Sequence, residues 1–293
     1  MQARNVYDNL TKESAMSGGG SGGGSGGGSG GGSGGGYGGP FPQHPFPICD
    51  PLTAFDPNDL RLNVTFPWTA WRGDLFGLVA LAEFGRTNWR CIPVAPPKAF
   101  DHPDTVTEIA AMIAMARDER PGLAEEILQQ DASLAGYFGQ VMTLSQGSHP
   151  STLKLLEMAA RVGEMVSIWF KLSFNRARLQ QVWPAFVPML QSPGHASYPS
   201  GHMLQSRLIA KSLAEAVPEA GNALVALADR IGRNREVAGV HFPSDTAAGR
   251  AIADAAFPML QGCAIYQTVL AMAQQEPAAP DVPAELARPP ECP

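Results

Sequence analysis

The chain has 293 residues, of which 44% are hydrophobic, and its formal net charge is −6. This length is enough for one large domain or two small ones, and the apolar content allows a sizeable core. The acidic balance argues against nucleic acid as the main partner, because proteins that follow a phosphate backbone usually carry a basic surface. No uninterrupted apolar run reaches about 18 residues, so we expect no membrane span.

The first part of the chain carries a low-complexity tract. Residues 18–39 are almost wholly Gly and Ser, in a repeat of three Gly and one Ser. Such a tract has no side chains to bury and behaves as flexible coil, whether it is a natural spacer or an engineered linker. We therefore expect residues 1–45 to be a disordered tail or linker with an N-terminal peptide. Residues 46–275 are expected to form a helical domain and residues 276–293 a Pro-rich tail.

The N-terminal residues are polar and lack the apolar segment of a secretory signal. The sequence as printed therefore predicts a cytoplasmic protein, or a periplasmic one if the Gly/Ser tract replaced the natural start. The four cysteines form no Cys-x-x-Cys pair, so we expect no metal held by thiolates.

The remaining chain has the apolar spacing that is typical of helices. We expect one helix in the proline-free stretch between Pro67 and Pro93, with Trp68 and Trp71 packed on the core. No region shows the period-two alternation of a half-buried strand, so the expected fold class is all-α, a bundle of about six to eight helices. Further helices are expected over residues 105–117, 121–138, 152–170 (with Ser151 as the N-cap), 200–217 and 220–236, and from 244 past Pro258, which should bend the last one.

Residues 198–202 read Tyr-Pro-Ser-Gly-His and predict a helix N-terminus that can hold an anion. Ser200 stands where an N-cap belongs, and Gly201 lets a ligand approach the backbone closely. The unpaired N–H groups and the positive dipole end of a helix form an anion site, and His202 in the first turn faces the same anion. The alternative is an ordinary N-cap beside a surface histidine.

Residues 234–245 supply complementary groups. Arg235 can donate two parallel hydrogen bonds to a phosphate-like oxyanion. Asp245 follows His241 by four residues, one helical turn. A carboxylate at that spacing can hold one imidazole nitrogen protonated and aim the other outward, as in nucleophilic sites. Alone, residues 234–245 also fit a capping Ser-Asp pair beside a packed histidine. Together with residues 198–202, however, they predict an oxyanion site.

The two stretches, Tyr-Pro-Ser-Gly-His and Arg-x5-His-x3-Asp, are similar to motifs two and three of the type 2 phosphatidic acid phosphatase superfamily. That superfamily includes bacterial class A acid phosphatases and vanadium-dependent haloperoxidases. Its first motif is Lys-x6-Arg-Pro, and Lys171 and Arg178 stand at that spacing. The resemblance covers residues 171–245 and implies the family's helical core, which would make residues 46–275 a catalytic domain.

Two positions depart from the family pattern. Leu179 stands in place of the Pro after Arg178, and Asn234 in place of the Ser that usually precedes Arg235. Leu can adopt the φ of a proline but does not enforce it, so Arg178 is expected to be less preorganised. Neither departure removes a charged group.

The resemblance implies that five residues hold the oxyanion. Lys171, Arg178 and Arg235 would contact its equatorial oxygens, and Ser200 and the N–H of Gly201 would add hydrogen bonds. Phosphoryl transfer needs positioning and compensation of charge on three oxygens more than elaborate covalent chemistry. Three cations and a helix N-terminus can supply both, so no metal or other cofactor is expected for a phosphatase.

The resemblance also implies three catalytic roles. His241 would be the nucleophile that takes the phosphoryl group, Asp245 would orient it, and His202 would be the general acid for the leaving group. The leading hypothesis is a metal-independent acid phosphatase that hydrolyses a small phosphomonoester through a phosphohistidine intermediate.

Two alternatives remain open at this point. A vanadate-dependent haloperoxidase shares the same anion cage, with vanadate as cofactor and His241 as its axial ligand, although the familiar haloperoxidases are considerably longer. A degenerate oxyanion-binding protein without turnover is suggested by Leu179 and Asn234. The motifs identify neither the substrate nor the oligomeric state.

Other polar residues near the motifs receive weaker expectations. His195 could line the mouth of the site, but a loop histidine on the surface is the preferred reading. Arg176 and Arg233 neighbour the motif arginines and are expected to be solvated or salt-bridged.

Overall fold

The computed structural model describes residues 60–61 and 63–276. The expectations for residues 1–45 and, beyond Glu276, for the Pro-rich tail lie outside the described residues. The described chain is helical and holds no strand, which confirms the all-α class. Its α-helices are α1 (Gly73–Phe84), α2 (Pro103–Asp118), α3 (Arg120–Ala132), α4 (Leu134–Val141), α5 (Pro150–Phe174), α6 (Leu179–Val182), α7 (Gly201–Ala216), α8 (Gly221–Val237), α9 (Pro243–Gln261) and α10 (Ala264–Ala273), with short 3₁₀ turns at Trp68–Ala70, Trp89–Cys91 and Pro218–Ala220.

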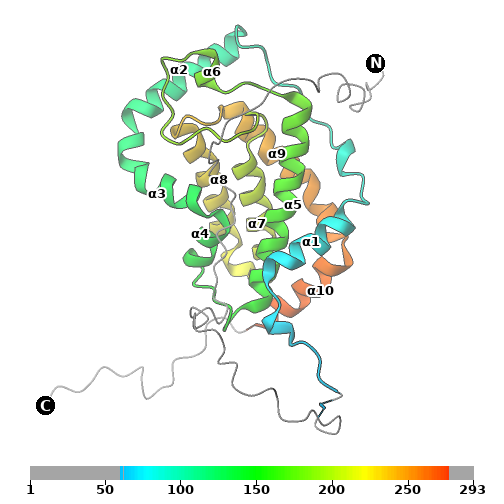
Figure 1. The fold of residues 1–293 in the computed structure, drawn as a ribbon. Coiled ribbons are helices and arrows are strands. Elements are labelled where there is room, and N and C mark those ends of the chain that lie inside the picture. The colour runs from blue at the N-terminus through cyan, green and yellow to red at the C-terminus, as the bar shows by residue number, and fades with distance from the viewer. Residues whose placement is uncertain (1–59, 62, 277–293) are drawn as a thin grey trace, which may run out of the picture.

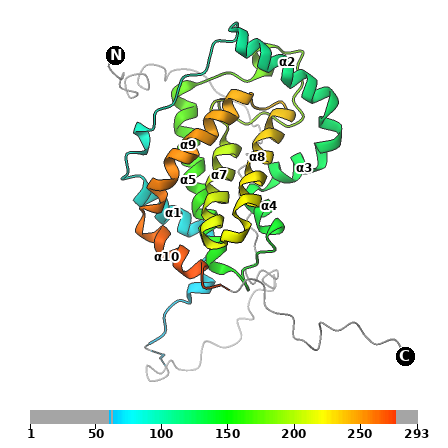
Figure 2. The same cartoon turned by 180° about the vertical axis from the view of Figure 1, so that it is seen from behind.

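The centre of the bundle is formed by α5 and α7, which run side by side (Figure 1). α1 covers the other side of α5, while α8 and α9 pack against α7, as the view from behind shows (Figure 2). Side chains such as Leu155, Val162, Leu204 and Leu208 are fully buried between these helices. Burial of this apolar surface is the main contribution that holds the bundle together.

α2 and α3 form an arm that reaches over one end of the bundle and down the side of α8 (Figures 1 and 2). The arm packs on a second apolar cluster, in which Met112 and Ile127 of the arm meet Leu179, Val237 and Phe242. The C-terminal ends of α5 and α8 and the N-terminal ends of α7 and α9 lie at this same end of the bundle. The predicted motifs are therefore gathered beneath the arm.

The described residues contain ten α-helices rather than six to eight, since some expected helices are divided. The helix expected over residues 121–138 is broken at Ser133, which has extended backbone and whose Oγ accepts a hydrogen bond from the N–H of Gly136 at 3.0 Å. The last helix continues past Pro258, as expected, but the sharp bend of 88° falls at the break between α9 and α10.

Two local expectations were wrong. α5 begins at Pro150, not after Ser151, because the Glu276 carboxylate accepts hydrogen bonds from the N–H groups of Ser151 and Thr152 and so caps the helix from the far end of the chain. Trp71 is 42% exposed instead of packed on the core, whereas Trp68 does contact it.

None of the described helices is by itself long and apolar enough to cross a membrane, and α9 and α10 reach that length and composition only as a bent pair.

Candidate active site

The N-terminus of α7 provides the backbone part of the site. Ser200 has extended backbone and is the N-cap, with its Oγ accepting from the N–H of Met203 at 3.4 Å. The Ser200 N–H donates to the carbonyl of Asp245 at 2.9 Å, which fixes this helix start against the start of α9. At Gly201 a Cβ would lie 3.3 Å from the Ser167 Oγ and 3.7 Å from the Lys171 Cε. The absence of a side chain therefore lets α7 begin directly beside Lys171.

His241 and Asp245 form the expected pair. The His241 Nδ1 lies 3.2 Å from the Asp245 Oδ2, and both side chains are buried. The same oxygen accepts hydrogen bonds from the Ser197 hydroxyl and, at 3.0 Å, from the N–H of Phe242. Burial alone would raise the pKa of Asp245, but the hydrogen bond from His241 and the charge of Arg176 outweigh it and lower that pKa to about 2. The carboxylate is therefore ionised and engages His241 through Nδ1, which leaves Nε2 free to react.

Lys171 and Arg178 bring two buried cations to the site. The Lys171 Nζ donates to the carbonyls of Ala196 and Ser197 at 2.9 and 2.8 Å. Burial, together with the nearby charge of Arg178, lowers the pKa of Lys171 to about 7. The Arg178 guanidinium donates to the carbonyls of His195, at 3.2 Å, and of Val240, and burial lowers its pKa to about 10. Both cations are held in place by the loop carbonyls around them.

Arg235, near the end of α8, is 1% exposed. Its Nη2 donates to the Asp131 Oδ1 on α3 at 2.9 Å. Its Nε and Nη1 are buried and have no hydrogen-bond partner in the described part of the chain. Buried guanidinium N–H groups are normally satisfied, because leaving a charged donor unpaired costs several kcal/mol, on the order of 1–3 or more. Two unpartnered donors on a buried guanidinium are groups that a bound oxyanion would satisfy.

His202 lies in the same electrostatic environment. Burial, and then the charges of Arg235, His241 and Lys171, lower its pKa well below the ordinary value of 6.5. Burial and the charge of Lys171 depress the pKa of His241 in the same direction. Because these charges act on one another, the motif residues share one site that is rich in positive charge.

The structure thus brings together the eight residues expected from the sequence. His195 is exposed and its Nδ1 lies 3.3 Å from the Arg178 Nη2, so it stands at the rim rather than apart from the site. Of the two neighbouring arginines, Arg233 is half-exposed and paired with Glu119 at 2.6 Å, but Arg176 is buried and paired with Asp245. The salt-bridged reading of Arg176 was therefore right and the solvated one wrong.

Sequence reasoning did not identify Ser197 or Asp131, and it did not predict that Arg176 contacts Asp245. All three residues touch motif side chains. Ser197 and Arg176 stand close to the motifs in sequence, but no spacing rule singled them out. Asp131 is separated from Arg235 by 104 positions, so only the fold reveals the contact.

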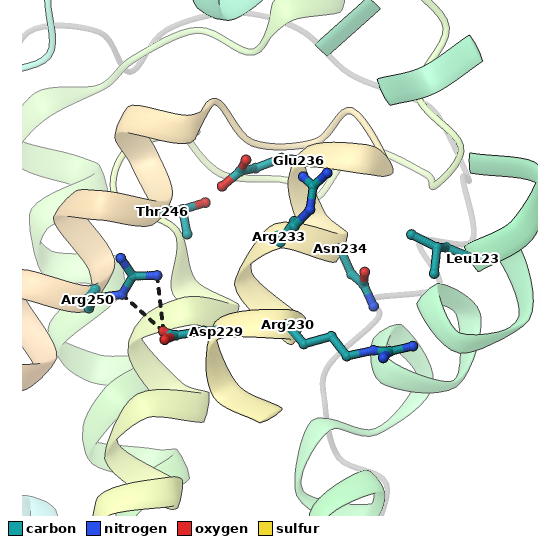
Figure 3. Close-up of a pocket in the computed structure, with 8 residues that line it drawn as sticks. All are labelled: Leu123, Asp229, Arg230, Arg233, Asn234, Glu236, Thr246 and Arg250. Atoms are coloured by element: carbon teal, nitrogen blue, oxygen red, sulfur yellow. Dashed lines mark hydrogen bonds and ion pairs between the residues drawn. The ribbon is translucent and has the colours of Figure 1, made fainter. Parts of the chain in front are cut away.

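An open cavity of about 580 Å³ lies on the outer side of α8 (Figure 3). None of the anion-holding residues lines it. Its three arginines are satisfied by carboxylates: Arg250 by Asp229 (Figure 3), Arg230 by Glu126 and Arg233 by Glu119. This hollow is therefore distinct from the predicted site beneath the arm. The lining residues are Leu123, Asp229, Arg230, Arg233, Asn234, Glu236, Thr246 and Arg250.

Sequence comparison gives local matches to acid phosphatases, while no family model matches the chain. A non-specific acid phosphatase of Salmonella typhimurium is 37% identical over 82 residues, which is 28% of this chain and 33% of that protein. One from Salmonella typhi is 38% identical over 80 residues, 27% of this chain and 32% of that protein. The match thus spans about a third of the length of these relatives. Both matches confirm the resemblance to the type 2 phosphatidic acid phosphatase superfamily.

Among solved structures, a transmembrane PAP2-type phosphatidylglycerolphosphate phosphatase from Bacillus subtilis aligns with 65% of this chain and 92% of its own. The TM-score is 0.41 and the sequence identity 18%.

Proposed function

We propose that this chain is a phosphatase of the type 2 phosphatidic acid phosphatase superfamily that hydrolyses a phosphomonoester through a phosphohistidine on His241. The observation that carries the proposal is the pair of unpartnered donors on buried Arg235, beside a histidine whose Nδ1 is held by Asp245. An oxyanion would satisfy the first group and be attacked by the second.

Binding of the substrate is attributed to the buried cations and the start of α7. Lys171, Arg178 and Arg235 would compensate the charge on the three non-bridging oxygens, with the Ser200 hydroxyl and the Gly201 N–H adding hydrogen bonds. The pKa of Lys171 is lowered by burial and by Arg178, so a bound dianion would relieve the repulsion among these groups. The proposal therefore requires no metal ion for charge compensation.

The first chemical step would transfer the phosphoryl group to the protein. The His241 Nε2 lone pair attacks phosphorus and forms the P–N bond while the ester P–O bond breaks. The departing alkoxide takes the proton of His202, so the alcohol leaves neutral. Asp245 remains ionised and stabilises the positive charge that develops on the His241 ring.

The second step would return the phosphoryl group to water. His202, now neutral, accepts a proton from a water molecule as its oxygen attacks phosphorus, and the P–N bond breaks. Inorganic phosphate is released, and both histidines return to their starting protonation states.

Vanadate resembles phosphate in shape and charge, so the same residues, including His241, would hold it. The proposal favours hydrolysis because the local sequence matches are to acid phosphatases. Vanadate then serves as an inhibitor in the test.

The test is a panel of phosphomonoesters assayed from acid to neutral pH, with and without vanadate, and with bromide and peroxide. The proposal expects phosphate release that vanadate inhibits and that His241→Ala abolishes, with unchanged helix content. His102→Ala, which alters an exposed histidine at the N-cap of α2, away from the predicted site, is the matched control. Activity retained by His241→Ala, or halide oxidation that depends on vanadate without phosphate release, would overturn the proposal.

A further inference from the structure

Arg176 contacts the Asp245 oxygen that His241 does not use. Its Nη1 lies 2.7 Å from the Asp245 Oδ1, whereas His241 contacts Oδ2. The Arg176 side chain is 3% exposed and that of Asp245 is fully buried. The carboxylate is therefore clamped between a guanidinium on one oxygen and an imidazole on the other.

The guanidinium of Arg176 is held through its Nη1 and its ring-facing side, whereas its buried Nε and Nη2 make no hydrogen bond within the described residues. The Nη1 also donates to the Ser244 Oγ at 2.8 Å, and the Phe242 ring lies 3.9 Å from the guanidinium carbon. Glu108 on α2 stands 3.8 Å from Nη2 and accepts hydrogen bonds from the N–H and the hydroxyl of Ser244 at 2.7 and 2.8 Å. The arm helix α2 thus helps to fix Arg176 against the first turn of α9, which contains Asp245.

Other charges act on Asp245 without pairing with it directly. The cations Lys171 and Arg178 and the Tyr198 phenol interact with its charge. Within the described residues, however, Arg176 is the one permanently charged group that hydrogen-bonds to the carboxylate. If it were removed, the buried carboxylate would keep only uncharged donors and His241 itself.

We propose that Arg176 is a positioning residue that fixes the Asp245 carboxylate so that its Oδ2 holds the Nδ1 of His241 and aims the Nε2 at the substrate. The inference rests on the proposed function, in which His241 is the nucleophile. Because Arg176 donates to Ser244 and Asp245, it acts on the orientation of the nucleophile and not on the binding of the oxyanion.

The planar guanidinium is important for this role. One Nη group serves Ser244 and Asp245 at once while the ring face rests on Phe242. A lysine would keep the charge but lose the rigid fork and the stacking, since its ammonium is a point charge on a flexible chain. Arg176→Lys should therefore fold and bind phosphate, yet hold Asp245 loosely.

The chain offers a matched control. Arg233 precedes the motif Arg235 by two residues, as Arg176 precedes Arg178, but it is half-exposed and pairs with Glu119. We compare Arg176→Lys and Arg176→Gln with Arg233→Lys and Arg233→Gln. The measurements are kcat, KM, the Kd of inorganic phosphate, and the imidazole ¹⁵N spectrum of His241.

The expected result is a loss of kcat of about 10- to 100-fold in the Arg176 variants, the cost of a nucleophile misplaced by about 1 Å. Arg176→Gln should have a lower kcat than Arg176→Lys. The Kd of phosphate should change less than about twofold, since no contact to the oxyanion is removed. The ¹⁵N spectrum should show a single Nδ1–H tautomer for wild-type His241 and a mixture in the variants.

A general loss of structure would raise the Kd of phosphate together with any loss of kcat, and would overturn the inference. So would an Arg176→Lys variant that matches Arg233→Lys in kcat and keeps the single tautomer. If Arg176→Gln fails to fold, the kcat and the tautomer of Arg176→Lys decide whether Arg176 positions His241. If the wild type releases no phosphate from any ester, the proposed function fails, and the tautomer measurement still decides whether Arg176 positions His241.

Discussion

Lys171 provides a direct test of whether positive charge is concentrated at the site. Its amine is buried beside Arg178, and its pKa falls from the ordinary 10.5 to about 7. A lowered pKa means that protonation favours the unfolded chain. Folding stability that is present above pH 10.5 is therefore lost as the pH falls towards 7. The substitution Lys171→Met removes this dependence while keeping a similar side-chain length.

The magnitude follows from the change in pKa. At about 1.4 kcal/mol per pH unit, lowering the pKa from 10.5 to about 7 costs the folded state about 5 kcal/mol once the amine is fully charged. Between about pH 9 and about pH 6.5 the wild type should lose roughly 2 to 3 kcal/mol of unfolding free energy that Lys171→Met does not lose. An oxyanion at 100 times its Kd should restore about 2.7 kcal/mol to the wild type through binding to the folded state alone.

The assay is denaturant unfolding at the two pH values, with and without inorganic phosphate. Lys211→Met is the control, because it removes an ammonium paired with Asp254 at 2.6 Å and should keep the response to phosphate. Equal losses of stability in the wild type and Lys171→Met, or equal stabilisation of both by phosphate, would refute the reasoning.

Three further predictions concern the surroundings of the cage. Asp131→Asn should lower kcat/KM about fivefold to tenfold, because Arg235 loses the charged partner that fixes its guanidinium; an unchanged kcat/KM would contradict this. Leu179→Pro should retain activity, since the position starts α6 and Arg178 before it already has the extended backbone (φ −84°, ψ 158°) that a following proline requires; a loss of more than about tenfold in kcat would count against it. The pH profile of kcat/KM should be highest on the acid side, because the pKa of His202 is lowered well below 6.5 and its acid form is lost as the pH rises; a profile that climbs from about pH 5 to about pH 9 would exclude His202 as the acid.

Sequence reasoning was strongest where the chemistry is local. The N-cap role of Ser200 and the four-residue spacing of His241 and Asp245 are properties of a helix turn, and the structure shows both. The all-α class followed from apolar spacing in the same way. These features need no knowledge of distant segments, so pattern and spacing were sufficient.

Contacts between distant segments were not predictable in this way. Glu108 and Asp131 belong to the arm, more than 100 positions before the residues they hold, and nothing in their own surroundings distinguishes them from surface carboxylates. For Arg176 the sequence left solvated and salt-bridged readings open, because its burial depends on α2 and on Phe242, which only the folded chain places around it. The start of α5 was misplaced for the same reason, since its cap is Glu276.

The central claim is that His241 carries the phosphoryl group, and the most direct measurement is to trap it. A rapidly quenched reaction with a ³²P-labelled phosphomonoester, kept at alkaline pH and digested, should place acid-labile label on the peptide that contains His241. The label should be absent from His241→Ala and accumulate in a His202 variant given a substrate with a good leaving group. Label on another residue, or turnover by His241→Ala, would contradict the mechanism.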